Sequence, residues 1–95
     1  MRLSKEVAEF LKKEIKKFLP DAEIYLFGSR VYKDKRGGDI DILVIGERKL
    51  SLMEKVKIRV AFFKRFGEQK IDIISFSRDE KSTFKEFALK EGVKL

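Results

Sequence analysis

EIYLFGSRVYKDKRGGDIDILVI, residues 23–45, is the stretch that decides the fold class. An apolar run over 23–27 ends at Gly28, and a second run over 39–45 begins with Asp39 and Asp41. Both runs have the length and composition of β-strands, and the second has the nearly continuous apolar sequence of a central strand. The basic segment between them predicts a short helical turn over 29–33 and then a charged loop.

The sequence on either side of this stretch predicts helices and one more strand. An apolar residue every fourth position predicts an amphipathic helix over 4–18. Ser51 and Glu54 form a capping box for a helix over 52–66, and residues 70–76 read as a third strand. Ser77 and Glu80 predict a second capping box, for a last helix that reaches about residue 90.

This order of elements predicts a single domain over residues 1–95. We expect an α/β (α+β) fold, with a three-stranded mixed sheet and helices packed mainly on one face. The helix over 52–66 has two apolar sides, one with Val56, Val60 and Phe63 and the other with Ile58, Phe62 and Phe66. A helix with two apolar sides in so small a domain often covers a partner as well as the core.

Composition excludes several kinds of chemistry. The 95 residues contain no Cys and no His, which excludes thiolate nucleophiles, a His general base and the usual zinc ligand sets. The formal net charge is +7, which suits an anionic substrate, and nucleic-acid binding that follows from charge alone would be nonspecific. No apolar run approaches about 18 residues, so we expect a cytoplasmic protein without a membrane segment.

Three acidic residues carry the predicted chemistry. Asp39 and Asp41 are two positions apart, so alternation along a strand places them on one face, where they repel each other unless a cation lies between them. Asp72 interrupts the apolar strand over 70–76 and would join them if the two strands are neighbours. A divalent metal site follows from this cluster. The alternative is a solvent-facing strand edge on which the acids only add solubility.

A Gly-Ser pair follows the first strand. Gly28 permits close backbone approach, and Ser29 offers a hydroxyl and an amide at a helix start, which is how phosphate oxygens are held. Taken alone, the pair favours the structural interpretation, a turn glycine followed by a helix-capping serine.

The combined motif, Gly28-Ser29, a spacer, then Asp39-Ile40-Asp41 in an apolar strand, resembles the signature of the minimal nucleotidyltransferases of the DNA polymerase β superfamily. The resemblance covers residues 1–92 and is closest to the antitoxin members of HEPN/MNT pairs. It implies a small nucleotidyltransferase-like fold in which Gly28, Ser29 and Arg30 contact the phosphates of ATP. It also implies that Asp39, Asp41 and Asp72 are catalytic and hold two Mg²⁺ ions.

The resemblance implies a function as well. We expect a Mg²⁺-dependent nucleotidyltransferase that transfers AMP from ATP to a hydroxyl of a helical HEPN-type partner and so acts as an antitoxin. The alternative is a noncatalytic module that neutralises this partner by binding it, its nucleotide and metal site being a remnant. The second apolar side of the helix over 52–66 would contact that partner, and a homo-oligomer is a further expectation.

Overall fold

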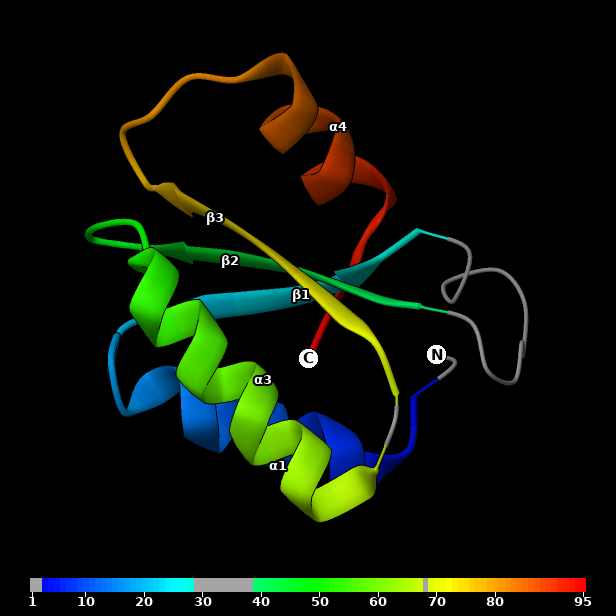
Figure 1. Ribbon diagram of the computed structural model, residues 1–95. Helices are drawn as coiled ribbons and strands as arrows, with labels where there is room; N and C mark the ends of the chain where they lie inside the picture. Colours follow the sequence, from blue (N-terminus) through cyan, green and yellow to red (C-terminus); the bar gives the residue numbers. More distant parts are fainter. Residues whose placement is uncertain (1–2, 29–38, 68) are drawn as a thin grey trace.

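The computed structural model describes residues 3–28, 39–67 and 69–95, and in these ranges three helices lie around a four-stranded sheet (Figure 1). The short turn predicted over 29–33 lies outside the described residues. In chain order the elements are α1 (Lys5–Lys16), β1 (Glu23–Phe27), β2 (Ile40–Gly46), α3 (Leu52–Phe66), β3 (Ile71–Ser77), α4 (Thr83–Glu91) and β4 (Val93–Lys94).

The sheet is mixed, as the sequence predicts, and its strand order is β3-β2-β1-β4. β2 pairs with β3 in parallel and with β1 antiparallel, and β4 pairs antiparallel with the other edge of β1. The prediction of three strands is therefore wrong by one. β4 has two residues, Val93 and Lys94, and so short a segment has no alternating pattern that a sequence reading can detect.

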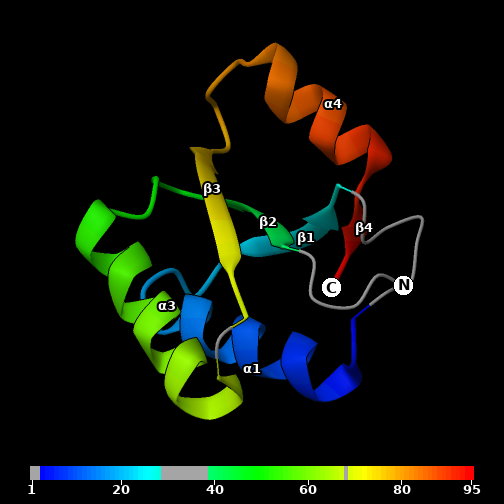
Figure 2. The same ribbon diagram turned by 45° about the vertical axis from the view of Figure 1, so that its right-hand side comes forward.

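The two faces of the sheet are covered by different helices. α1 and α3 pack on one face, whereas α4 lies on the opposite face (Figures 1 and 2). Two of the three described helices therefore pack on one face, as expected, and α4 is the exception. The physical reason is that Leu43 and Ile45 of β2 and Phe76 of β3 present apolar side chains on the second face, and α4 covers them around its buried Ala88.

The main core lies under α1 and α3. Leu11 and Ile15 of α1 are fully buried, and the N-terminal cap is Ser4, whose hydroxyl accepts a hydrogen bond from the Val7 amide at 3.2 Å. The helix ends at Lys16, two residues before the predicted end. Beyond it, the amides of Phe18 and Leu19 both bond to the Ile15 carbonyl in a tighter turn.

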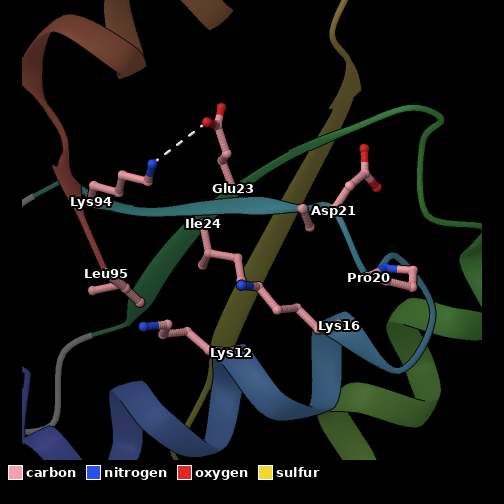
Figure 3. A pocket seen from close by; sticks show the side chains of 9 residues that line it. Lys12, Lys16, Pro20, Asp21, Glu23, Ile24, Lys94 and Leu95 are labelled. Atoms are coloured by element: carbon pink, nitrogen blue, oxygen red, sulfur yellow. Dashed lines mark hydrogen bonds and ion pairs between the residues drawn. The ribbon is translucent and has the colours of Figure 1, made fainter.

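The C-terminal strand and α1 border a cavity of about 370 Å³ at the β1–β4 edge (Figure 3). Lys12 and Lys16 reach toward it from α1, and Lys94 of β4 forms an ion pair with Glu23 at 3.5 Å. None of the three predicted catalytic acids lines this cavity.

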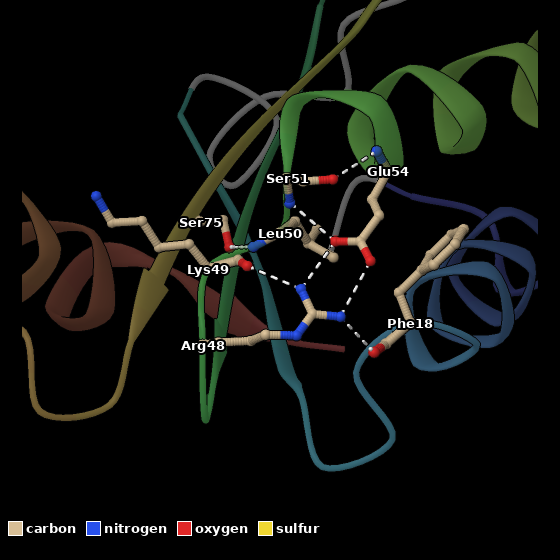
Figure 4. A network of polar contacts seen from close by, with 7 residues as sticks. All are labelled: Phe18, Arg48, Lys49, Leu50, Ser51, Glu54 and Ser75. Carbon is tan, nitrogen blue, oxygen red and sulfur yellow. Dashed lines mark hydrogen bonds and ion pairs between the residues drawn. The ribbon is translucent and has the colours of Figure 1, made fainter.

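α3 begins at the predicted capping box. The Ser51 hydroxyl accepts from the Glu54 amide at 3.1 Å, and the Glu54 carboxylate accepts from the Ser51 amide at 2.8 Å. Arg48 adds two hydrogen bonds to the same carboxylate and a third to the Phe18 carbonyl (Figure 4). The start of α3 is thereby tied to the turn that follows α1.

The two apolar sides of α3 have different environments. Ile58 and Phe62 are buried in the core, whereas Val56, Val60 and Phe63 are 39%, 46% and 55% exposed. The same outer side carries the exposed Leu52 and Met53. We call these five exposed residues the outer face of α3.

The last helix begins later than predicted. Its N-cap is Ser82, not Ser77, because Ser77 is still the final residue of β3. Lys85 holds the intervening turn. Its side chain is buried and its ammonium group donates to the carbonyls of Ser77, Arg78 and Glu80 at 3.0, 2.8 and 2.8 Å. Among the described helices, none combines the length and the apolar character needed to cross a membrane.

Candidate functional site

Gly28 follows the last residue of β1 and lies directly against the carboxylate of Asp41. Its φ is +84°, a backbone conformation that L side chains rarely adopt. A Cβ atom at this position would collide with the Asp41 Oδ2 atom. Both the conformation and the close approach therefore require glycine here. Ser29 and Arg30, the other two predicted phosphate contacts, lie outside the described residues.

Asp41 and Asp72 come together as the sequence predicts. β2 and β3 are neighbours, and Asp41 is the Cα partner of Asp72 in their parallel register. The residues on both sides of each aspartate face the α1–α3 core, so alternation directs both carboxylates to the face that carries α4. Both aspartates are half-buried.

The pKa of Asp41 is raised above its ordinary value. Partial burial is the largest cause, followed by the negative charges of Asp72 and Asp39, while the Lys70 ammonium acts in the opposite direction. The Asp41 carboxylate therefore lies near other negative charges and is partly removed from solvent. A bound cation would stabilise its ionised form.

Asp39 is less closely integrated into the site. It precedes β2 by one residue, is exposed, and forms an ion pair with Lys70 at 3.7 Å. In the described parts of the chain, no three acidic side chains are close enough together to hold a metal ion. Two of the three predicted acids, Asp41 and Asp72, are thus Cα partners in the register of β2 and β3, and we call them the register pair. The third, Asp39, forms its ion pair with Lys70.

Sequence reasoning missed two parts of the surroundings. The sequence indicates Lys70 only as the start of a strand. In the structure its ammonium group forms an ion pair with Asp39 and offsets the negative charge near Asp41. An aromatic cavity of about 250 Å³ adjoins Gly28 and includes Phe84 and Phe87 of α4. The one-turn spacing of these two phenylalanines was the available signal, but it does not distinguish a buried helix face from a cavity wall.

A second cavity, of about 370 Å³, lies beside Asp72 at the other edge of the site. Arg59 and Phe63 of α3 and Lys70 line it together with Asp72. Asp72 therefore borders a cavity on the side of α3, whereas neither Asp41 nor Asp72 lines the aromatic cavity beside Gly28.

The solved structures that resemble this fold include three toxin–antitoxin complexes. A toxin–antitoxin structure with AMP-PNP matches with a TM-score of 0.72 at 20% identity, over 92% of this chain and 70% of that chain. A toxin–antitoxin MntA-HpeT variant, with two Asp residues changed to Glu, matches with a TM-score of 0.71 at 18% identity over the same shares. The tri-AMPylated HEPN toxin of Shewanella oneidensis in complex with its MNT antitoxin gives 0.62 at 20% identity, over 94% and 65%.

At these identities the structures establish a similar fold and no more. No curated protein matches the chain. A family model described as polymerase beta, nucleotidyltransferase, matches residues 6–95, which include Gly28, Asp41 and Asp72. The chain therefore belongs to the polymerase beta nucleotidyltransferase family.

Proposed function

We propose that this protein is a Mg²⁺-dependent nucleotidyltransferase that transfers AMP from ATP to a hydroxyl of a helical, HEPN-type toxin and thereby acts as an antitoxin. The observation that carries the proposal is the register pair of Asp41 and Asp72, with Gly28 packed against the Asp41 carboxylate. A paired-carboxylate site beside a backbone that can closely approach phosphates is what phosphoryl chemistry without histidine requires.

The residues fit magnesium. Mg²⁺ is commonly held by one or two carboxylates, with water and substrate phosphates as its other ligands, so the pair needs no third protein ligand before ATP binds. Asp41 and Asp72 would hold the ion, and Asp39 would join them by leaving Lys70. Two bound Mg²⁺ ions would supply charge neutralisation at the α-phosphate and alignment of the reacting oxygens.

The chain's own residues would position the reactants. Gly28 and Ser29 would bind the β- and γ-phosphates, with Gly28 letting the triphosphate approach the backbone, and Arg30 would be a further triphosphate contact. The acceptor oxygen attacks the α-phosphorus, its proton passes to Asp72, and the bond to the β-phosphate oxygen breaks so that pyrophosphate leaves. The product is an AMP ester of the acceptor hydroxyl.

Three features of the structural relatives support this assignment. One contains AMP-PNP, a triphosphate analogue. One contains an AMPylated toxin beside its MNT antitoxin, which is the product that such a transfer would form. A third carries two Asp-to-Glu changes in a toxin–antitoxin complex.

Calorimetric titration with AMP-PNP tests the site. We expect weak binding in EDTA and clearly tighter binding with Mg²⁺, because the acidic pair repels a bare triphosphate. Asp41→Asn should lose the gain in AMP-PNP affinity that Mg²⁺ gives. Asp79→Asn, which changes an exposed aspartate on the turn before α4, should keep this gain. Equal AMP-PNP affinity of the wild type with and without Mg²⁺ would contradict the proposed metal site.

The alternative function is noncatalytic neutralisation of the toxin by binding. The outer face of α3 favours it, because five apolar side chains are exposed on one helix without cover from the described residues. Val60→Glu should abolish co-purification with a co-expressed HEPN-type toxin, while the isosteric Val60→Thr should retain it. Toxin neutralisation without any AMP transfer by the wild type would establish this alternative.

A further inference from the structure

The cavity beside Gly28 has an aromatic lining. It is formed at the end of β1 and along α4 by Phe27, Gly28, Phe84, Phe87, Ala88 and Glu91, and its volume is about 250 Å³. Ala88 is fully buried and contributes no bulk, so the space between the two phenylalanines of α4 and the end of β1 stays open.

The two phenylalanines of α4 differ in how firmly they are held. The Phe84 ring meets Phe27 edge-on at 5.7 Å between centroids and lies 6.5 Å from Phe76. Phe87 is 60% exposed. Phe84 is itself 42% exposed, so the cavity is lined by one ring with two aromatic neighbours and by a second, more exposed ring one turn further along α4.

The cavity adjoins the acidic site through Gly28, although neither Asp41 nor Asp72 lines it. Gly28 belongs to both, and Phe27 is the Cα partner of Asp41 in the antiparallel pairing of β1 and β2. A molecule whose phosphates lie at Gly28 therefore has its remaining part within reach of the aromatic lining.

The size of the cavity limits the occupant. Clefts that hold drug-sized ligands usually measure about 300–1,000 Å³, so this smaller space suits one flat ring system rather than a complete nucleotide. Bases stack on aromatic side chains in many nucleic-acid-binding proteins, since every base has a π-face. The occupant that fits both the lining and the neighbouring phosphate chemistry is a nucleobase.

We propose that the cavity lined by Phe84 and Phe87 is the nucleobase subsite for the nucleoside triphosphate substrate. The proposal rests on the proposed function, because it needs the triphosphate to lie at Gly28. Recognition is by stacking on Phe87, so purine nucleotides bind more tightly than pyrimidine nucleotides, whose π-face is smaller.

The test compares a ligand with a base to one without. AMP-PNP and inorganic tripolyphosphate are titrated in the presence of Mg²⁺ against the wild type, Phe87→Ala and Phe87→Tyr. We expect Phe87→Ala to weaken AMP-PNP binding about tenfold, Phe87→Tyr to restore it, and tripolyphosphate binding to stay unchanged throughout. Met53→Ala removes an equally exposed apolar side chain, from the outer face of α3, and should change neither affinity.

The outcomes separate the subsite from the proposed function. Equal AMP-PNP affinity of the wild type and Phe87→Ala would overturn the subsite. So would wild-type tripolyphosphate binding as tight as AMP-PNP binding, which would leave the phosphate and metal site intact. Failure of both ligands to bind the wild type with Mg²⁺ would overturn the proposed function, and the subsite with it.

Discussion

Asp41 and Asp72 are direct partners across two neighbouring parallel strands, although 31 positions separate them in the sequence. Parallel strands need a crossover connection, and here α3 supplies it. The register that this crossover sets places two carboxylates side by side on a half-buried face. The candidate chemistry of the protein depends on that register.

Gly28→Ala should destabilise the protein more than Gly67→Ala. Both glycines have a φ of +84°, but an added Cβ meets nothing within 4 Å at Gly67, whereas at Gly28 it meets the Asp41 carboxylate. Gly67→Ala should cost about 1–3 kcal/mol of unfolding free energy through backbone strain alone. Gly28→Ala should add at least about 1 kcal/mol to that cost and abolish AMP-PNP binding.

A double-mutant cycle in EDTA isolates the collision. Asp41→Ala removes the carboxylate that the new Cβ would meet, so Gly28→Ala should cost about 1 kcal/mol less in that background. Urea unfolding of the four proteins measures this coupling. Strictly additive changes would mean that Gly28 is required only for its φ.

Asp41→Asn should stabilise the metal-free protein, and Asp39→Asn should not. Burial and neighbouring charges raise the pKa of Asp41, so its ionised form opposes folding, and the neutral amide removes this effect. Solvent screening limits the gain to roughly 0.5 kcal/mol. Asp39 instead has Lys70 as a partner, so its neutralisation should leave stability unchanged or slightly lower. Thermal melts in EDTA distinguish the two variants, and a stabilised Asp39→Asn would show that Lys70 does not compensate its charge.

Stability should fall in acid through Glu54. Hydrogen bonds from Arg48 and then from the Ser51 amide lower the pKa of Glu54 from 4.5 to about 2. A carboxylate with a lowered pKa contributes its full stability above the unfolded value, and loses it as the pH falls from 4.5 toward 2. With solvent screening, the contribution is about 1 kcal/mol. Urea unfolding against pH should therefore be flatter for Glu54→Gln in this range.

Lys85→Met should loosen α4 from the sheet. The Lys85 ammonium donates to three carbonyls of the turn between β3 and α4, and its loss leaves them to find water. We expect a cost of about 2 kcal/mol in unfolding free energy. Lys90→Met, at an exposed position of the same helix, should cost less than about 0.5 kcal/mol. Equal costs would mean that the three hydrogen bonds contribute nothing to stability.

Much of this architecture follows from local patterns. The strand predicted over 23–27 has the observed bounds, and those predicted over 39–45 and 70–76 each lie one residue from the observed strands. Period-two alternation also places Asp41 and Asp72 on one face once the two strands are neighbours. These features depend on residues close together in the chain, so local sequence patterns are enough to predict them.

Other features depend on tertiary contacts. Asp39 precedes the strand, so alternation does not govern it, and Lys70 approaches it only because β2 and β3 pair. The start of α4 depends on the Ser82 cap and on the three carbonyls that the Lys85 ammonium contacts, and the second of these is not encoded in a capping pattern. The aromatic cavity exists because α4 crosses to the second face of the sheet, and a helical spacing of phenylalanines does not specify that face.

The most direct measurement of the central claim is transfer of label from α-³²P-ATP to the helical partner in Mg²⁺. Wild type and Asp79→Asn should label the partner at the same rate, whereas Asp41→Asn and Asp72→Asn should each label it at least about a hundredfold more slowly, because the charges that hold the metal would be lost. Circular dichroism melts establish that each variant is folded. Labelling by folded Asp41→Asn or Asp72→Asn at the wild-type rate would contradict the account.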